Sequence, residues 1–270
     1  IITKITVNSL SATKDITLNA KVIETADLIA TNNIFINKDS EVLEQTLNIT
    51  GDVSSNNFEA VAKTQTFGGT ISVENDFTSE GETFTFAGKV TVNQKAQIQN
   101  TGLLKISDFV YGKSFVQKGS ESEIGQVMIS GSFEQSGESG ESEKPTATFG
   151  SNVYFYNSSQ NSLPITIGSD KSSTTINGNL IIAKSKENDV AIKGTVFSNN
   201  FALYSGNVDL SGELSTEKDV VILGENYSLK DDQTGIENLY SYTENRPAHW
   251  SQASYTFETS LPDGTPLPDG

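Results

Sequence analysis

The chain has 270 residues, 35% of them hydrophobic, and no cysteine, which excludes disulfides, thiolate zinc sites and cysteine nucleophiles. Its 34 acidic and 18 basic residues give a net charge of −16, which repels phosphate backbones and anionic lipids and argues against nucleic-acid binding and membrane docking. No run of residues reaches the roughly 20 apolar positions that a membrane-spanning helix needs, so we predict no membrane insertion.

Short alternating segments predict β-strands along most of the chain. Apolar and polar residues alternate in them with the period of a half-buried strand. Residues 21–31 fit either a short helix or two strands, and we expect strands. The predicted strands, in chain order, are Ile2–Val7, Asp15–Leu18, Asn33–Asn37, Thr46–Thr50, Thr70–Val73, Glu82–Phe86, Lys89–Asn93, Leu103–Ser107, Gln126–Ser130, Val153–Tyr156, Pro164–Ile167, Asn179–Ala183, Asp189–Ile192, Asn207–Leu210 and Asp219–Leu223.

A short motif, apolar–any–Gly–any–apolar, returns along the chain. Its glycines are Gly51, Gly69, Gly88, Gly131, Gly178, Gly194 and Gly212, separated by 18, 19, 43, 47, 16 and 18 residues. The two long intervals equal roughly two or three short ones. A repeat of about 20 residues indicates a chain wound into stacked turns, each packed only against its neighbours.

Glycine and asparagine mark the predicted corners between strands. The motif glycine shares the inward parity of its apolar neighbours, so we interpret it as a bend, or a residue with positive φ, where a side chain would collide with the core. Asparagines stacked in successive turns are expected to hydrogen-bond as a ladder inside the coil. Segment 49–58 matches segment 192–201 at seven of ten positions, which supports true repetition.

These patterns predict an all-β fold, a single-stranded parallel β-helix or β-solenoid, over residues 1–224. Roughly eleven turns, spaced about 4.8 Å apart, would form a rod on the order of 50 Å long. The glutamate-rich segment 134–145 is expected to form a loop. We expect one continuous core that includes Val53, Ile71, Val90, Ile181, Val196 and Leu210.

Residues 225–270 are irregular and aromatic, and they hold the only His, Trp and Arg of the chain. An open solenoid end exposes strand edges and needs covering, so a cap is one interpretation of this tail. A linker to a further domain and a ligand site are the others. The chain opens on Ile1 and ends on a near-tandem Leu-Pro-Asp-Gly sequence, so we expect a mature fragment or a piece of a longer protein.

Few residues suit catalysis or metal binding. The carboxylates Asp231–Asp232 and Glu74–Asp76 are closest in sequence to the pair that a glycosidase needs, but solvated turns explain them better. His249 stands beside Trp250, and no G-x-S-x-G elbow accompanies it. The glutamate-rich stretches lack the spacing of a dedicated calcium loop. We therefore predict no catalytic, cofactor-binding or metal-binding residues and no cofactor.

The glycine-centred turns, the Asn and Ser corners, the lack of cysteine and the acidic charge resemble the β-helical stalks of bacterial surface proteins. Filamentous-haemagglutinin-like adhesins and autotransporter passengers are the nearest such families. The resemblance covers about residues 45–224 and carries over no functional residues. It implies a right-handed parallel β-helix, an extracellular or cell-surface location, and a scaffold or adhesive role.

We accordingly expect a non-catalytic, exported bacterial surface protein, a β-helical stalk or adhesin. Its expected partners are a host matrix protein or glycan, or neighbouring domains of a longer chain. Two alternatives stay open. A concave row of aromatic and carboxylate side chains would favour a carbohydrate-active enzyme or carbohydrate-binding module on a β-helix, and filament formation would favour a self-assembling, bactofilin-like scaffold.

Overall fold

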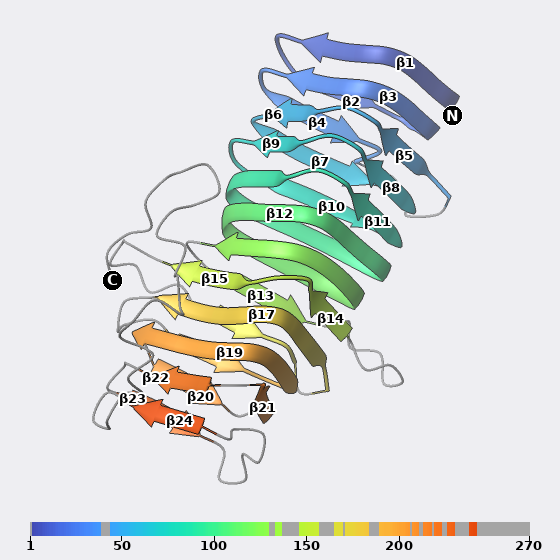
Figure 1. Ribbon diagram of the computed structural model, residues 1–270. Helices are drawn as coiled ribbons and strands as arrows, with labels where there is room; N and C mark the ends of the chain where they lie inside the picture. Colours follow the sequence, from blue (N-terminus) through green and yellow to red (C-terminus); the bar gives the residue numbers. More distant parts are fainter. Residues whose placement is uncertain are drawn as a thin grey trace.

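The computed structural model describes residues 2–38, 44–129, 133–136, 146–156, 165–169, 171–183, 189–205, 207–210, 213–217, 219–222, 226–229 and 238–241. All secondary-structure elements in these ranges are β-strands. The 24 strands join into one sheet by parallel pairing. The fold is therefore all-β, as predicted. Figure 1 shows the strands stacked one above another from β1 to β24.

The strand bounds follow the chain. They are β1 Ile2–Ala12, β2 Ile16–Leu18, β3 Ala20–Ala30, β4 Asn33–Ile36, β5 Thr46–Ile49, β6 Val53–Ser55, β7 Asn57–Val61, β8 Thr64–Phe67, β9 Ile71–Val73, β10 Phe77–Gly81, β11 Thr83–Phe86, β12 Val90–Ile129, β13 Phe133–Ser136, β14 Thr146–Phe149, β15 Val153–Tyr156, β16 Ile165–Ile167, β17 Ser173–Ala183, β18 Asp189–Ile192, β19 Thr195–Ser205, β20 Asn207–Leu210, β21 Glu213–Thr216, β22 Asp219–Ile222, β23 Asn226–Leu229 and β24 Asn238–Ser241.

Each strand pairs with the strand that occupies the same place one repeat later in the chain. Thr46 of β5 lies beside Thr64 of β8, and Thr64 in turn lies beside Thr83 of β11, so the register follows the spacing of the motif glycines. The interval grows where the chain inserts extra residues, as between Phe133 of β13 and its partner Ile165 of β16. We call the stretch of chain between two such register partners a turn.

Each turn between residues 46 and 86 has three sides. The first side consists of β5, β8 and β11, the second of β6 and β9, and the third of β7 and β10. The 40-residue strand β12 continues round more than one turn, since Val90 pairs with Ile71 at its start and Val127 pairs with Val153 near its end. The three strands predicted at 89–93, 103–107 and 126–130 therefore overlap with this one continuous strand.

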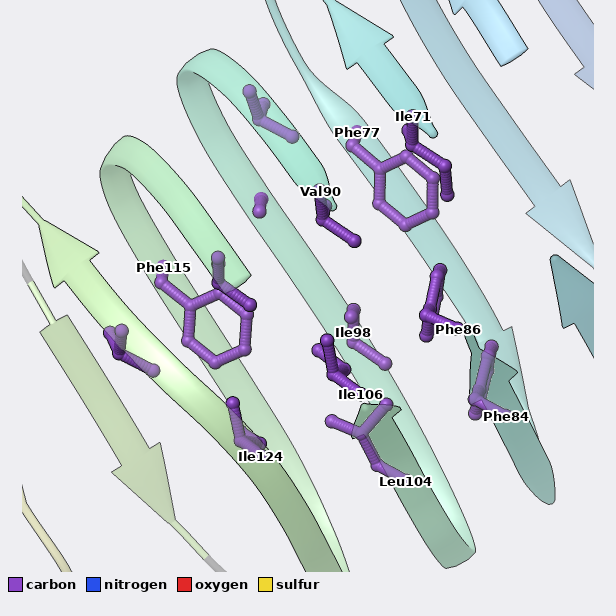
Figure 2. Close-up of a cluster of buried hydrophobic side chains, with 14 of the residues drawn as sticks. Ile71, Phe77, Phe84, Phe86, Val90, Ile98, Leu104, Ile106, Phe115 and Ile124 are labelled. Carbon is purple, nitrogen blue, oxygen red and sulfur yellow. The ribbon is translucent and has the colours of Figure 1, made fainter. Parts of the chain in front are cut away.

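Alternate residues of each side point inward and stack on the equivalent residues of the next turn. Phe58 and Phe77 are parallel, with ring centroids 4.8 Å apart, and Phe67 and Phe86 repeat that geometry at 4.7 Å. Phe58 and Phe67, which lie on different sides of one turn, meet edge-to-face at 5.8 Å. Figure 2 shows this run of inward side chains continuing along the sheet. Offset-stacked and edge-to-face contacts are both favourable aromatic geometries.

The predicted core is confirmed at four of its six positions, is wrong at one and is untested at another. Val53, Ile71, Val90 and Val196 all belong to it. Ile181 is buried, but it is not part of this core, because its neighbours Leu180 and Ile182 are the residues that point inward. The side chain of Leu210 lies outside the described residues.

The motif glycines are needed for close approach between turns. A Cβ on Gly69 would lie 2.4 Å from the carbonyl carbon of Gly51, and one on Gly88 would lie 2.4 Å from the carbonyl oxygen of Gly69. The expected collision with the core is therefore wrong, because the obstacle is the backbone of the previous turn. Positive φ occurs at Gly194 (66°) and also at Gly168 (78°), which stands outside the motif.

The matching segments 49–58 and 192–201 occupy different sides of their turns. Gly51 stands at the corner between the first and second sides, whereas a Cβ on Gly194 would meet Ser169 and Ser172, at a corner that precedes β17. Likewise, Phe201 is registered through Leu180 and Val153 with Val127, not with the side of Phe58. Every side uses the same alternation of apolar and polar residues and the same residue types at its corners. Sequence similarity between two short segments therefore does not show that they lie on the same side.

Three predicted boundaries change. Residues 20–30 form strand, as expected, but one strand (β3) rather than two. Parallel pairing continues past residue 224, because β23 pairs with β20 and β24 pairs with β22. The loop expected at residues 134–145 is wrong for 134–136, which belong to β13 and pair with β12, and residues 137–145 lie outside the described ranges.

Replacing Phe77 with Ala should lower the free energy of unfolding by about 3–5 kcal/mol, because it leaves a cavity between Phe58 and Phe86 in a core that cannot collapse along the stack. Its exposed neighbour Thr78 provides the control, and Thr78→Ala should stay within about 0.5 kcal/mol of the parent chain. Chemical denaturation followed by circular dichroism measures both changes, and equal effects would contradict the core assignment.

Gly69→Ala should destabilise the protein by roughly 1–3 kcal/mol, since the added methyl group meets rigid backbone and forces the two turns apart. Gly150→Ala is the matched control, because its Cβ would meet nothing closer than 3.8 Å. The difference in thermal midpoint between the two variants tests whether close backbone approach, rather than glycine content, matters at this corner.

Candidate binding surfaces

A column of Asp and Asn side chains links successive turns at the corner between the second and third sides. Asp15 Oδ1 accepts hydrogen bonds from the backbone N–H and the Nδ2 of Asn33, at 3.1 and 2.9 Å. Asn57 Nδ2 donates to Asn33 Oδ1 (2.8 Å), Asp76 N–H donates to Asn57 Oδ1 (3.3 Å), and Lys95 N–H donates to Asp76 Oδ1 (3.2 Å). The predicted asparagine ladder is confirmed in one link, Asn57 to Asn33, while aspartates make the other links. The residues of the column are half-buried or exposed at an outer corner, not buried in the core.

A second column runs along the corner between the first and second sides, where Gly51, Gly69 and Gly88 lie; we call this the glycine corner. Asp27 Oδ1 accepts the backbone N–H of Asp52 at 3.0 Å, and Asp52 Oδ1 accepts both the N–H and the hydroxyl of Thr70, at 2.7 and 2.9 Å. The backbone N–H of Thr70, followed by its hydroxyl, lowers the pKa of Asp52 below the ordinary aspartate value. The charged form of Asp52 therefore helps to hold one turn on the next.

Five threonines and one asparagine occupy the outward positions on the first side between residues 46 and 85. Thr46, Thr64 and Thr83 occupy one register row, and Asn48, Thr66 and Thr85 occupy the row beside it. All six residues are half-buried. An ion pair lies at each end of these rows. Lys4–Glu24 (2.8 Å) precedes them, with Glu24 beside Asn48, and Lys105–Glu123 (3.2 Å) follows them, with Lys105 beside Thr85. The first side thus presents an uncharged threonine surface between charged borders.

Glu74 and Asp76, the carboxylates that the sequence analysis weighed as a pair and interpreted as solvated turn residues, both hydrogen-bond to the next turn. Glu74 Oε2 accepts a hydrogen bond from Asn93 Nδ2 at 2.8 Å, and Asp76 belongs to the corner column. Asp231, Asp232, Arg246 and His249 lie outside the described residues. Within the described part of the chain, no group of three or more His, Cys, Asp or Glu side chains is placed to hold a metal ion.

Sequence reasoning missed a set of polar side chains on the core-facing side of the sheet. Gln65 Nε2 donates to the carbonyl oxygens of Ala62 (3.3 Å) and Glu80 (3.0 Å), while Gln65 Oε1 accepts from the Ser79 hydroxyl (2.7 Å). Gln117 Nε2 donates to Asn100 Oδ1 at 2.9 Å, and Asn100 Nδ2 donates to Glu121 O at 2.9 Å. The sequence did carry a signal for them, because they occupy positions that the apolar–polar alternation assigns to the core. Their amide groups bond to one another and to backbone carbonyl oxygens near the corners, including that of Glu80, which also accepts the N–H of Ala62.

The second side changes character along the stack. In the N-terminal half its outward register positions hold Ser11, Ile29, Ser54, Ser72 and Thr91. In the C-terminal half the outward positions hold Met128, Tyr154 and Ile181, followed in register by Ala202, Val221 and Tyr240. Ile29 is 41% exposed, whereas Met128, Tyr154 and Ile181 are 0%, 5% and 6% exposed.

Comparison with known proteins adds no identification. No protein family, curated protein or solved structure matches this chain. Among the described residues, no helix is long and apolar enough to cross a membrane.

The charge of Asp52 should stabilise the fold at neutral pH and lose that effect in acid. The pKa of Asp52 is lower in the folded chain than in the unfolded chain, where it is about 3.9. The charged carboxylate therefore adds its full contribution to the free energy of unfolding above this unfolded value, and the contribution disappears as the pH falls through the lower folded pKa. Asp52→Ala should therefore lower the thermal midpoint at pH 7, and the gap to the parent chain should narrow below about pH 4. Asp52→Asn keeps an oxygen acceptor, so its thermal midpoint at pH 7 should fall less than that of Asp52→Ala. A difference in midpoint between Asp52→Ala and the parent chain that does not change with pH would contradict a role for the charge.

Proposed function

We propose that the parallel sheet is the wall of a right-handed parallel β-helix, a β-solenoid, and that this rod serves as a non-catalytic stalk or adhesive surface of an exported bacterial protein. The observation that carries the proposal is continuous parallel pairing from one end of the sheet to the other, with register shifts only within the β17–β19 pair among the pairings given below. Parallel pairing leads from β1 through β3, β5, β8, β11 and β12 to β14, β17, β19, β22 and β24.

The contacts between turns support a stiff spacer. Side-chain hydrogen bonds reinforce the backbone pairing at two corners, through Asp15 to Lys95 at one and Asp27 to Thr70 at the other. The ion pairs Lys38–Glu59 and Lys63–Glu82 also join one turn to another. Because the links run along the stack, each added turn lengthens the rod without enlarging its cross-section.

The outer surface supports adhesion through many weak contacts. The threonine surface offers methyl and hydroxyl groups in a regular array, with net charge confined to its borders. A surface of this kind suits a matrix protein or glycan contacted at low affinity, with avidity supplied by many copies on a cell. The net charge of −16 keeps such copies soluble and separate.

Binding by the single chain should be weak, and display in many copies should strengthen it. The purified chain and the same chain coupled densely to beads should be compared on arrays of matrix proteins and glycans, where coupling should raise retention about 100-fold or more. Converting Thr64 and Thr83 together to Glu should abolish the gain, whereas the same change at Ser54 and Ser72, outward on the second side, should not.

The carbohydrate-enzyme alternative predicts a different outcome. Incubation with pectins, glucans and glycosaminoglycans should release neither reducing ends nor unsaturated products. Turnover of any of these polymers, abolished by substitution of one carboxylate, would replace the stalk by an enzyme.

A further inference from the structure

The outward charges of the first side are arranged symmetrically, with opposite signs, about the turn that holds Thr64 and Thr66. Two turns before this central turn, Glu24 stands in the register row of Thr66, and two turns after it Lys105 stands in the same row. Three turns before it, Lys4 stands in the row of Thr64. In Figure 1, β5, β8 and β11, which form the middle of this surface, lie one below another on the right of the stack.

The position that mirrors Lys4 holds a carboxylate. Lys105 contacts Glu123 of the following turn at 3.2 Å, and Glu121 lies two residues earlier on the same outward face. Both glutamates are exposed, and they continue in adjacent rows into β14. Reading the turns in order therefore gives a positive, a negative, three uncharged, a positive and a negative turn. Reversal of this order places every charged turn opposite a turn of the other sign.

The uncharged positions follow the same symmetry. Val22 stands two turns before the centre in the row of Thr64, and Leu103 stands two turns after it, because Phe84 and Thr85 pair with the two residues that follow Leu103. Both side chains are half-buried although they point outward. Two apolar groups thus lie at equal distances on either side of the threonine surface.

Two copies of such a surface fit each other face to face. A two-fold axis that runs along the strands through the central turn brings each turn against the turn of opposite position and keeps each row in line with itself. Glu24 then faces Lys105 of the second copy, Lys4 faces Glu121, and Val22 faces Leu103. Because the axis is two-fold, each of these contacts occurs twice.

We propose that the first side, from Lys4 to Glu123, is an interface at which a second copy of this chain binds in antiparallel orientation. The charges select the orientation. In a parallel pair, a two-fold axis along the stack would bring each turn against itself and exchange the two rows, so Glu121 would meet Glu123 and Val22 would meet Glu24. Like charges that face each other oppose association, and the antiparallel pair has none of these contacts.

The charged side chains are free enough to make these contacts. The side chains of Lys4 and Glu24 are 53% and 38% exposed, and those of Lys105 and Glu123 are both 49% exposed. Each ion pair within one copy therefore joins the ion pair of the other copy in an alternating row, Lys4–Glu24 against Lys105–Glu123. Rim charges of this kind determine register and partner more than they add affinity.

The size of the surface makes the pairing weak. Seven turns at about 4.8 Å and a side about four residues wide bury on the order of 800 Å² over both copies, below the range of stable complexes. The net charge of −16 also opposes association. The dimer therefore forms at high local concentration, and there it covers the threonine surface to which the proposed function assigns adhesion. The pairing itself stands on the register and charges of the first side, whichever other ligand that surface binds.

Charge reversal with complementation tests the interface. The parent chain should approach the mass of two copies in analytical ultracentrifugation as its concentration rises from roughly 1 μM to 1 mM. Glu24→Lys and Lys105→Glu each place two like-charged pairs in the dimer and should each weaken self-association at least about tenfold. An equimolar mixture of the two variants restores both pairs in a mixed dimer, and its association should return to within about threefold of the parent chain.

The matched control lies on another side of the same strands. Ser54→Lys and Ser72→Glu, outward on the second side, change the charge equally and should leave the association of the first side unchanged. All variants should unfold at nearly the same temperature as the parent chain, because exposed ion pairs contribute little to stability. A parent chain that stays monomeric at 1 mM, or a mixture that associates no more strongly than its two components, would overturn the proposal.

The lack of native cysteine allows a test of orientation. Thr66→Cys lies on the two-fold axis, so a short bis-maleimide should join two copies of this variant rapidly, whereas two copies of Glu24→Cys should be joined at least about tenfold more slowly. Glu24→Cys mixed with Lys105→Cys should again give rapid cross-linking. Faster cross-linking of Glu24→Cys to itself than to Lys105→Cys would show a parallel pair and refute the antiparallel one. None of these measurements uses a matrix protein or glycan, so their outcome is independent of the test of adhesion.

Discussion

Parallel register between successive turns is the constraint on which the rest of this structure depends. A turn that hydrogen-bonds in parallel to the previous one places each residue over its register partner at about one strand spacing. The side chains must then match those above and below them. Phe58 over Phe77 and Phe67 over Phe86 satisfy this requirement with stacked rings, and Thr46 over Thr64 over Thr83 satisfies it on the outer surface.

The corners follow from the same constraint. Where two sides of a turn meet, the backbone leaves the regular ladder, and its polar groups need other partners. At the glycine corner the backbones approach so closely that only Gly51, Gly69 and Gly88 fit, while Asp27 and Asp52 accept the free N–H groups of the following turn. On the core-facing side of the sheet, Gln65 and Asn100 bind carbonyl oxygens at another corner. Polar residues at the corners therefore contribute to the cohesion of the stack.

The two faces of the wall carry different information. The inner face is mainly apolar along the whole stack, with a few buried polar side chains such as Gln65 and Asn100. The outer face of the second side changes from mainly serine and threonine in the N-terminal half to Met128, Tyr154 and Ile181 in the C-terminal half. Strands buried on both faces read as continuous apolar runs. Val153–Tyr156 and Leu180–Ala183 have that character, in contrast to Ile71–Val73, where a serine separates two core residues. This contrast was the signal in the sequence for the burial of Tyr154 and Ile181.

The sequence by itself determined the strand content, the approximate length of a turn and most of the core, because period-two alternation and a regularly returning glycine depend only on local geometry. Tertiary structure alone decided which side each strand occupies. Gly51 and Gly194 share a motif yet stand at different corners, since all sides use the same residue pattern. It also decided that the glycines serve contact between turns, that Ile181 lies outside the core, and that Glu74 and Asp76 bind the next turn rather than form a site. Each of these depends on which residues, a full turn or more apart in the chain, the register brings together, and no local pattern records that.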